Sequence, residues 1–571
     1  MKNKKLIFLE NKLQVKEFIE NGPKYSKFLP ISFSFEVEKI LEKLNINFKK
    51  DGDYEDRIDT KNLSSKAMSE TWEVVKRSKL KYRGVSILDA FYYELYLIFV
   101  NSKKYSSLFK KIIEMENPEE IVIFNSNSSS EKENIFLLAK ENYDGKIRVV
   151  NYDGKITSKK SKSFVLSSIS RLQKIITLLR INCFKNKNKI FISGGKMYFR
   201  DIIDGLVADK KNKIIDFSDR LRKSFFIGKI YVPFYEFFGE KSTLQEEFEE
   251  DFLKFKREFD SSNVFEKERQ RYIRENISSL LDSKIKNLLP KLEEAYNLFK
   301  KKKITSILFC ENDAPLSRGL TELANRFDVK TYIFQHGLMM CDVGTFTSAD
   351  YYFVFGDVSK KAMEKNCSKK TKVISVGCPR YSSFKCGYAK RRKEIVYAME
   401  IANERVILPD THLTRKRQRE LLKKLFNVMK KIPDYKLILK IRPNWELKEI
   451  ISLIAKAEEF ENYEIIEKTD NKKLLSEASA VIVNNSTMGV EAILLGAPLI
   501  SLSYPNLDKV NSYKKFPGVK VVYTEKELES EIKKKLKSFS GFSKKEIKDQ
   551  IIFDGKTNEK ILEIIKKDLI K

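Results

Sequence analysis

One of the two histidines of this 571-residue chain, His336, stands where an apolar run ends at a glycine. The run 332–334 is followed by Gln335, His336 and Gly337, the layout of a buried strand that delivers a titratable side chain to a cleft. Imidazole is the side chain that most often accepts or donates a proton at neutral pH. We therefore expect His336 to act as a general base. The alternative is a histidine that only makes hydrogen bonds in a loop.

A second group of candidate residues follows the apolar run 480–483. Its members are small or polar and lie in a turn and in the helix start expected after it: Asn485, Ser486, Thr487, Gly489 and Glu491. Backbone N–H groups and hydroxyls in such a turn can bind phosphate, and the helix dipole adds about half a positive charge. Glu491 would suit ribose hydroxyls. The alternative is an ordinary helix cap by Ser486 or Thr487.

Cationic candidates follow two other runs of the same half. His412 follows a Pro-Asp-Thr segment, and Lys440 and Arg442 lie where the run 435–441 ends. The planar guanidinium of Arg442 can pair with a phosphate and stabilise charge that grows on a leaving group. In the expected first domain, Asp313 ends a strand-like run and could orient an acceptor. The alternatives are surface residues and, for Asp313, a helix N-terminal acid.

The elements that must position these residues alternate along the chain. Strand-like runs are separated by amphipathic stretches, which predicts an α/β fold with parallel sheets covered by helices on both faces. The predicted strands are 120–125, 146–152, 189–193, 304–310, 329–334, 350–355, 372–376, 405–408, 435–441, 463–467, 480–484 and 498–503. The segment 244–303 is dense in Glu, Lys and Leu at helical spacing, which suggests two long helices.

The expected architecture is two Rossmann-like domains that face a cleft. The first comprises residues 1–390, with a helical insertion at about 244–303, and the second comprises residues 391–571, after a polar linker at 385–394. In open parallel sheets, ligands bind at the carboxyl ends of the strands. The turns at His336 and Ser486 should therefore open toward the same cleft.

Length and composition limit the class of protein. A chain of 571 residues exceeds one hydrophobic core, so we expect more than one domain. No apolar run approaches the ~20 residues that span a bilayer, and the first residues do not resemble a signal peptide, so we expect a cytoplasmic protein. Six cysteines occur without a C-x-x-C pair, which argues against a zinc site and against a disulfide framework.

The net charge of +31 is compatible with nucleic acid, an anionic membrane surface, an acidic substrate or a simple bias toward lysine. No nucleic-acid-binding motif is present, so we expect no nucleic-acid partner. The segment 220–238 interleaves basic and aromatic residues, which suits peripheral binding to the inner face of an anionic membrane. Packing of its aromatic side chains against the helical insertion would explain the same residues.

At these residues, the chain resembles the GT-B superfamily and, within it, enzymes of bacterial and archaeal surface-polysaccharide synthesis. The related groups are capsule-polysaccharide glycosyltransferases, CDP-glycerol glycerophosphotransferases and polysialyltransferase-like proteins. The resemblance covers about residues 304–505 and rests on three motifs: Gln335-His336-Gly337, Gly377 to Arg380, and Ser486-Thr487 followed by Gly489-x-Glu491-Ala492. It implies a nucleotide-sugar or CDP-polyol donor on the second domain, bound with the help of His412, Lys440 and the 485–491 residues.

The same resemblance implies a glycan or lipid-linked acceptor near Asp313, Gln335, Gly337 and Arg380. It implies direct displacement without a metal and without a cofactor, with His336 and Arg442 as the catalytic residues. Relatives often have Lys-x-His-Pro where this chain has Lys440-Ile441-Arg442-Pro443, which favours electrostatic stabilisation by a permanent cation over acid catalysis. Asp51-Gly52-Asp53 spells the metal-binding Asp-x-Asp of other glycosyltransferases, but we interpret it as a solvated turn.

Two other functions stay open. A relative of UDP-N-acetylglucosamine 2-epimerase would share the GT-B fold, although the helical insertion and the large N-terminal region fit a compact epimerase less well. A non-catalytic basic scaffold would leave His336, Arg442 and the 486–487 turn without a shared purpose. The donor, the acceptor and the linkage depend on pocket shape, which these motifs do not specify.

Overall fold

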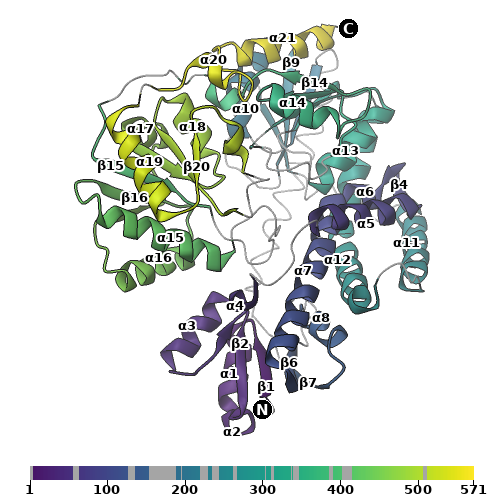
Figure 1. Ribbon diagram of the computed structural model, residues 1–571. Coiled ribbons are helices and arrows are strands. Elements are labelled where there is room, and N and C mark those ends of the chain that lie inside the picture. The colour runs from purple at the N-terminus through teal and green to yellow at the C-terminus, as the bar shows by residue number, and fades with distance from the viewer. Residues whose placement is uncertain are drawn as a thin grey trace, which may run out of the picture.

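The computed structural model describes residues 4–55, 63–126, 135–152, 188–193, 196–218, 229–233, 243–261, 266–301, 304–309, 314–335, 337–338, 346–382, 384, 390–400, 414–505, 511–539 and 541–570. Three parallel sheets dominate this part of the chain, with helices around them (Figure 1). The predicted α/β class is therefore confirmed. Their strands are short apolar runs such as 480–483, whose four residues are all buried, as expected for parallel strands covered on both faces.

The first sheet has five strands in the order β3-β2-β1-β6-β7. Its strands are β1 (Lys4–Leu9), β2 (Phe28–Ser32), β3 (Lys49–Lys50), β6 (Pro118–Ser126) and β7 (Lys146–Tyr152). The helices of this region are α1 (Lys12–Glu20), α2 (Gly22–Tyr25), α3 (Phe35–Lys43), α4 (Gly52–Glu55), α5 (Leu63–Arg77), α6 (Ile87–Ala90), α7 (Tyr92–Glu116) and α8 (Phe136–Glu141). A small antiparallel pair, β4 (Lys81–Tyr82) and β5 (Val85–Ser86), lies between α5 and α6 in the sequence.

The second sheet has seven strands in the order β10-β9-β8-β11-β12-β13-β14. They are β8 (Asn188–Ser193), β9 (Asn212–Ser218), β10 (Lys229–Pro233), β11 (Ser306–Phe309), β12 (Lys330–Phe334), β13 (Tyr351–Val354) and β14 (Lys372–Ser375). Their helices are α10 (Lys196–Val207), α11 (Thr243–Ser261), α12 (Lys267–Lys300), α13 (Pro315–Arg326), α14 (Asp357–Glu364) and the 3-10 turn η2 (Pro379–Tyr381). The last helix of the chain, α21 (Thr557–Ile570), returns to this sheet, where Ile561 and Ile565 join its core.

The third sheet has six strands in the order β17-β16-β15-β18-β19-β20. They are β15 (Glu394–Ala398), β16 (Lys436–Lys440), β17 (Tyr463–Ile466), β18 (Ala480–Val483), β19 (Leu499–Leu502) and β20 (Lys520–Val522). Their helical elements are α15 (Arg415–Lys430), α16 (Trp445–Ala457), α17 (Asn471–Glu477), α18 (Met488–Leu494), η4 (Ser512–Lys515), α19 (Glu525–Lys537) and α20 (Lys544–Ile547). We call this unit, residues 394–547, the donor unit, after the role that the sequence analysis expects of it.

Strand order places a switch point in the donor unit. Counted from β15, its strands run 3-2-1-4-5-6, the Rossmann order, so β15 and β18 lie side by side while their connections leave toward opposite edges. The seven-stranded sheet follows the same order with one added strand. Two Rossmann-like sheets of this kind are the arrangement expected of a GT-B-like fold. In such sheets the crevice at the reversal of strand order is the usual ligand site.

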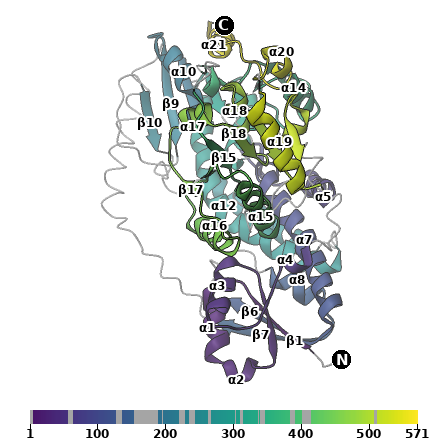
Figure 2. The same cartoon turned by 60° about the vertical axis from the view of Figure 1, so that its left-hand side comes forward.

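The two helices expected at 244–303 are present as α11 and α12. Helix α12 packs against α7, α8 and α13, so it joins the first sheet to the second through one continuous core. In Figure 2 the first sheet lies at one end of the molecule, with α15 and α16 of the donor unit beside α3 and α4. The ion pair between Lys39 and Glu449 confirms that α3 and α16 are neighbours.

Two features of the fold differ from expectation. Residues 1–390 contain two parallel sheets rather than one. The sequence did not predict the additional sheet because β1, β2 and β3 are short segments with no clear periodicity. The donor unit begins with β15 (Glu394–Ala398), directly after the segment interpreted as a linker, whereas the predicted strand 405–408 lies outside the described residues. The division of the chain at residue 390 stays a prediction.

Candidate active site

The turns after β12 and β18 lie against one another. A Cβ atom added to Gly337 would stand 3.7 Å from Cγ2 of Thr487, which is ordinary van der Waals contact. Leu338 packs into the same hydrophobic cluster as Val490 and Tyr513 of the donor unit. The strand positions in the sequence predicted this convergence, and the structure brings the two turns together.

Gln335 holds the first turn in place. Its buried side chain donates from Nε2 to the carbonyl oxygen of Gly337, at 2.8 Å, and its Oε1 accepts from the backbone N–H of Phe355, at 2.9 Å. The amide therefore ties the end of β12 to the end of β13. Gln335 acts on the shape of the turn on either side of position 336.

The second turn leaves one hydroxyl available. Thr487 is the N-cap of α18, yet its side chain makes no capping hydrogen bond and has no partner within the described part of the chain. The hydroxyl of Ser486 accepts only a long bond from the N–H of Met488, at 3.4 Å. An ordinary cap by Thr487 thus does not explain this turn. Helix α18 itself has only seven residues.

Two neighbours shape the same turn. Asn485 accepts from the N–H of Ser512, at 3.1 Å, and the hydroxyl of Tyr513 donates to the carbonyl oxygen of Ser486. Gly489 lies under the ring of Tyr513, because a Cβ atom there would stand 2.3 Å from the tyrosine oxygen. The glycine is required by packing, and its assignment to the donor stays a prediction.

Glu400 is the titratable residue that the sequence reasoning missed. It follows β15 at the switch point, is half-buried, and its carboxylate accepts a hydrogen bond from the backbone N–H of Asn485. Burial raises its pKa from 4.5 to about 7, against the opposing effects of that hydrogen bond and of Arg442. A carboxyl group that titrates near neutral pH in a crevice is typical of acid–base or ligand-binding chemistry.

The signal for Glu400 was present but weak. It lies two residues beyond the short run 394–398, which is mostly apolar. Because the basic residues Lys390 to Lys393 precede this run directly, the run was interpreted as part of a linker. Once the run is recognised as a strand, Glu400 stands at a carboxyl end like Ser486 and Arg442. No feature of the sequence alone indicates its raised pKa.

Arg442 and Lys440 have different surroundings. Arg442 is exposed, it acts electrostatically on Glu400, and it has no hydrogen-bond partner among the described residues. Lys440 donates to the carbonyl oxygens of Glu467 and Ile441, at 2.8 and 3.0 Å, and burial lowers its pKa. Within the described ranges, Arg442 is therefore the cation of this pair that is better placed to meet an anion.

Glu491 and Arg380 meet across the junction of the second sheet and the donor unit. The carboxylate of Glu491, whose side chain is 3% exposed, pairs with Arg380 at 3.2 Å and accepts from the hydroxyl of Tyr381 at 3.3 Å. Burial raises the pKa of Glu491 above its ordinary value. The carboxylate also has a hydrogen bond with the side chain of Asn471, and its assignment to a ribose stays a prediction.

Three predicted site residues, His336, His412 and Asp313, lie outside the described residues, as does most of the basic and aromatic segment 220–238. Within the described ranges, no cluster of three or more His, Cys, Asp or Glu side chains is arranged to hold a metal ion. In the same ranges, no helix is both long enough and apolar enough to cross a membrane.

The interpretation of Asp51-Gly52-Asp53 as a solvated turn is wrong. Asp51 is half-buried and pairs with Arg415 of the donor unit, with distances of 3.1 and 3.2 Å to its two oxygens. Asp53 accepts from the N–H of Lys50, at 2.9 Å. The turn faces the donor unit because β3 ends there, a placement that the local sequence does not reveal.

Comparisons with known proteins give a match to one family model and matches to several solved structures. The family model described as UDP-N-acetylglucosamine 2-epimerase matches residues 345–566, which is less than half of the chain. The search of curated proteins gives no match.

Among solved structures, the chain is similar to UDP-GlcNAc 2-epimerase of Methanocaldococcus jannaschii in complex with UDP-GlcNAc and UDP, with 13% identity over 67% of this chain and 99% of that one, at a TM-score of 0.41. It is similar to the Neisseria meningitidis epimerase bound to UDP-GlcNAc, with 11% identity over 66% and 100% and a TM-score of 0.40. It is also similar to the wall teichoic acid polymerase TagF soaked with CDPG, with 13% identity over 71% and 98% and a TM-score of 0.35.

Proposed function

We propose that this protein is a transferase that moves a sugar or polyol phosphate from a nucleotide-activated donor to a glycan or lipid-linked acceptor in cell-surface polysaccharide synthesis. The observation that carries the proposal is the convergence at the switch point. Glu400, Arg442 and the hydroxyl of Thr487 follow three neighbouring strands of the donor unit, and Gly337 of the facing sheet lies against Thr487. The nucleotides named for the epimerases and the CDPG named for TagF agree with an activated donor.

Each group has a definite part in this scheme. The exposed guanidinium of Arg442 pairs with the donor phosphates and offsets the charge that develops as they leave. The hydroxyl of Thr487 donates a hydrogen bond to a phosphate oxygen. Glu400, with a pKa of about 7, can donate or accept a hydrogen bond to the nucleoside near neutral pH.

The reaction is a direct displacement in which atoms and electrons balance. An acceptor hydroxyl attacks the activated carbon or phosphorus, and its proton passes to His336. The bond from that centre to the nucleotide phosphate breaks, and the electron pair leaves with the phosphate oxygen. Attachment to the inner face of a membrane, where lipid-linked acceptors are found, is part of this proposal.

An epimerase is the second candidate, favoured by the family match over residues 345–566. Epimerisation at carbon 2 requires removal and return of a proton, and Glu400 has a pKa suited to either step. The two candidates share the nucleotide site and differ in whether the sugar leaves the nucleotide.

The first experiment is a thermal-shift panel with CMP, CDP, UDP, GDP and their sugar or glycerol conjugates. It is run on wild type, on Ser486→Ala/Thr487→Ala and on Arg442→Ala, with Lys436→Ala, at the opposite end of β16, as the cation control. We expect one nucleotide family to stabilise wild type and Lys436→Ala but neither of the other variants. If no nucleotide stabilises the folded wild type, the donor site is wrong and the non-catalytic scaffold becomes the better explanation.

The conjugate found in this way separates the two chemistries. Proton NMR of that conjugate with wild-type enzyme distinguishes inversion at carbon 2 without loss of nucleotide from release of free nucleotide in the presence of a glycan acceptor. Inversion supports the epimerase, and release that depends on acceptor supports the transferase. His336→Ala with undiminished turnover would remove His336 as the base in either case.

A further inference from the structure

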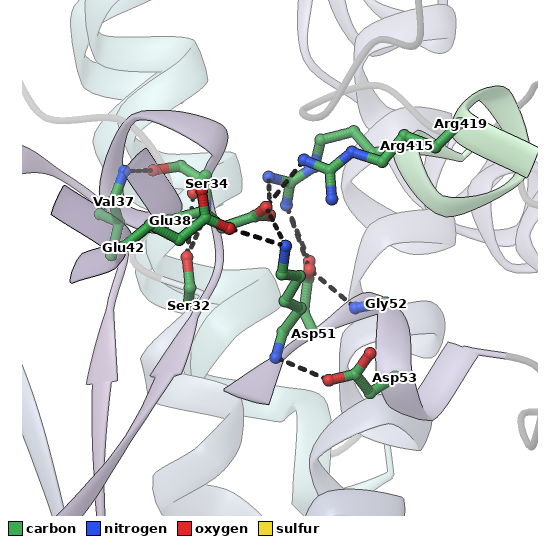
Figure 3. Close-up of polar contacts among 11 residues, drawn as sticks. Ser32, Ser34, Val37, Glu38, Glu42, Asp51, Gly52, Asp53, Arg415 and Arg419 are labelled. Carbon is green, nitrogen blue, oxygen red and sulfur yellow. Dashed lines mark hydrogen bonds and ion pairs between the residues drawn. The ribbon is translucent and has the colours of Figure 1, made fainter. Parts of the chain in front are cut away.

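A cluster of buried charges joins the first sheet to the donor unit (Figure 3). Glu38 of α3 accepts from Arg419 at 2.7 Å and from Arg415 at 3.1 Å, and it forms an ion pair with Lys50 at 3.1 Å. Asp51 accepts a bidentate bond from Arg415. These side chains surround a hollow of about 190 Å³. The two arginines lie 364 to 381 positions beyond their acidic partners in the sequence.

The charges of the cluster are partly shielded from water, and at Asp51 burial outweighs Arg415 and raises the pKa of that carboxyl group. The side chains of Glu38 and Arg415 are 3% and 11% exposed. Burial works to raise the pKa of Glu38, but Arg419, Arg415 and Lys50 outweigh it and hold that pKa below its ordinary value. Charge pairs of this kind, with several hydrogen bonds each, are geometrically restrictive, and loss of one partner leaves the other charge buried and unpaired.

Helix α15 connects the cluster to the switch point. Arg415 and Arg419 are one turn apart and present the same side of the helix to Glu38. Between them, Gln418 is buried and donates from Nε2 to the backbone carbonyl oxygen of Glu400, at 2.5 Å. Thr414 caps the helix through the N–H of Arg417. The first turn of α15 is thus held by the N-terminal sheet on one side and holds Glu400 on the other.

We propose that Arg415 and Arg419 are positioning residues, through which the N-terminal sheet fixes α15 and so fixes Glu400 at the switch point of the donor unit. This gives the first sheet, which is not one of the two facing Rossmann-like sheets, a part in shaping the site. The inference rests on the proposed function only in taking that site to bind a nucleotide.

The direct readout is the ionisation of Glu400, which needs no ligand. Among the described residues, the charged and titratable groups that interact with Glu400 from neighbouring elements are Arg442 after β16, Tyr397 of β15 and Tyr513 of η4. For each protein, the unfolding free energy is measured across pH with and without the added substitution Glu400→Gln. The pH dependence of the difference between the two gives the midpoint for ionisation of Glu400. It is measured in wild type, in Arg415→Ala and in Glu38→Gln, with Arg415→Lys as the conservative variant.

The chain offers a matched control in Lys39→Ala. This change breaks the ion pair of Lys39 and Glu449, which joins the same two units through α3 and α16 rather than through α15. We expect Arg415→Ala and Glu38→Gln to raise the acid dissociation constant of Glu400 at least tenfold, because the carboxyl group gains water when α15 shifts. Lys39→Ala should leave the constant unchanged, and Arg415→Lys should recover part of the effect.

Nucleotide affinity is the second readout, with UDP and CDP titrated by calorimetry at pH 6 and pH 8. About tenfold weaker binding in the cluster variants, and unchanged binding in Lys39→Ala, supports the inference. If the cluster variants melt earlier but keep both the Glu400 midpoint and the affinity, the cluster is structural only and the inference is overturned. If the midpoint moves while wild type binds no nucleotide, the inference stands and the proposed function fails. Should Arg415→Ala not fold, Arg419→Ala tests the same contact.

Discussion

Replacing Glu400 with glutamine is expected to stabilise the protein at pH 8 and to change little at pH 4.5. Burial raises the pKa of Glu400 from 4.5 to about 7, so the folded protein resists ionisation of this carboxyl group. The unfolded chain ionises near 4.5, and stability is therefore lost as the pH rises from 4.5 through 7. Glutamine keeps the shape and can still accept the hydrogen bond from the N–H of Asn485, but it cannot ionise.

The magnitude follows from the two pKa values. At 1.36 kcal/mol per pH unit, the difference between 4.5 and about 7 corresponds to roughly 3 kcal/mol. With an m-value of ~2 kcal/mol per molar urea, the midpoint of Glu400→Gln should exceed that of wild type by about 1.5 M at pH 8. Below pH 4.5 the carboxyl group of Glu400 is mostly protonated in the folded and in the unfolded chain. The urea midpoints of wild type and Glu400→Gln should therefore coincide.

The assay must report on the donor unit, because a protein with several units need not unfold in one step. The chain has two tryptophans, Trp72 in α5 and Trp445 in α16 of the donor unit. In a Trp72→Phe background, Trp445 fluorescence in urea follows the donor unit alone. A gap between Glu400→Gln and its parent that does not grow between pH 4.5 and pH 8 would refute the raised pKa. It would also remove Glu400 as an acid–base candidate.

Three further outcomes are expected. Gly489→Ala should lower the thermal midpoint and the free energy of unfolding, the latter by about 1–3 kcal/mol, because the added Cβ would stand 2.3 Å from the Tyr513 oxygen. Gly22→Ala is the control and should leave the stability nearly unchanged, because no atom lies within 4 Å of its added Cβ. Arg380→Ala should lower the free energy of unfolding in urea by roughly 2 kcal/mol, less than loss of a fully buried pair because Arg380 is 32% exposed. Adding Glu491→Gln should recover most of this loss. A double variant that is no more stable than Arg380→Ala would contradict the pairing. Burial raises the pKa of the Cys378 thiol to about 12, so iodoacetamide at pH 8 should leave Cys378 unmodified in the folded protein and modify it in urea, as read by peptide mass spectrometry.

Local patterns were sufficient for many elements of this fold. The run 146–152 is a strand with the predicted bounds, and α11 and α12 occupy the helical stretch between 244 and 303. The polar turn after 480–483 was found because a buried parallel strand is a short apolar run and the residues beyond it must be polar or small. The meeting of Gly337 with Thr487 followed from the rule that ligand sites lie at carboxyl ends of parallel strands.

The local sequence failed where the decisive partner is distant. It did not separate the first sheet from the second, it missed β15, and it assigned Asp51 to solvent. A five-residue strand beside lysines and arginines has no period that distinguishes it from a linker. The surroundings of a charge depend on residues hundreds of positions away.

By itself, the sequence determined the alternation of strands and helices and the residue types at the strand ends, because both arise from interactions over a few residues. Only the tertiary structure decided what those residues experience. Burial raises the pKa of Glu400 to about 7 against the hydrogen bond from the Asn485 N–H, and Arg415 is held because Glu38 and Asp51 arrive from another sheet. Burial and charge pairing are properties of the assembled chain, since each requires segments far apart in sequence to occupy the same volume.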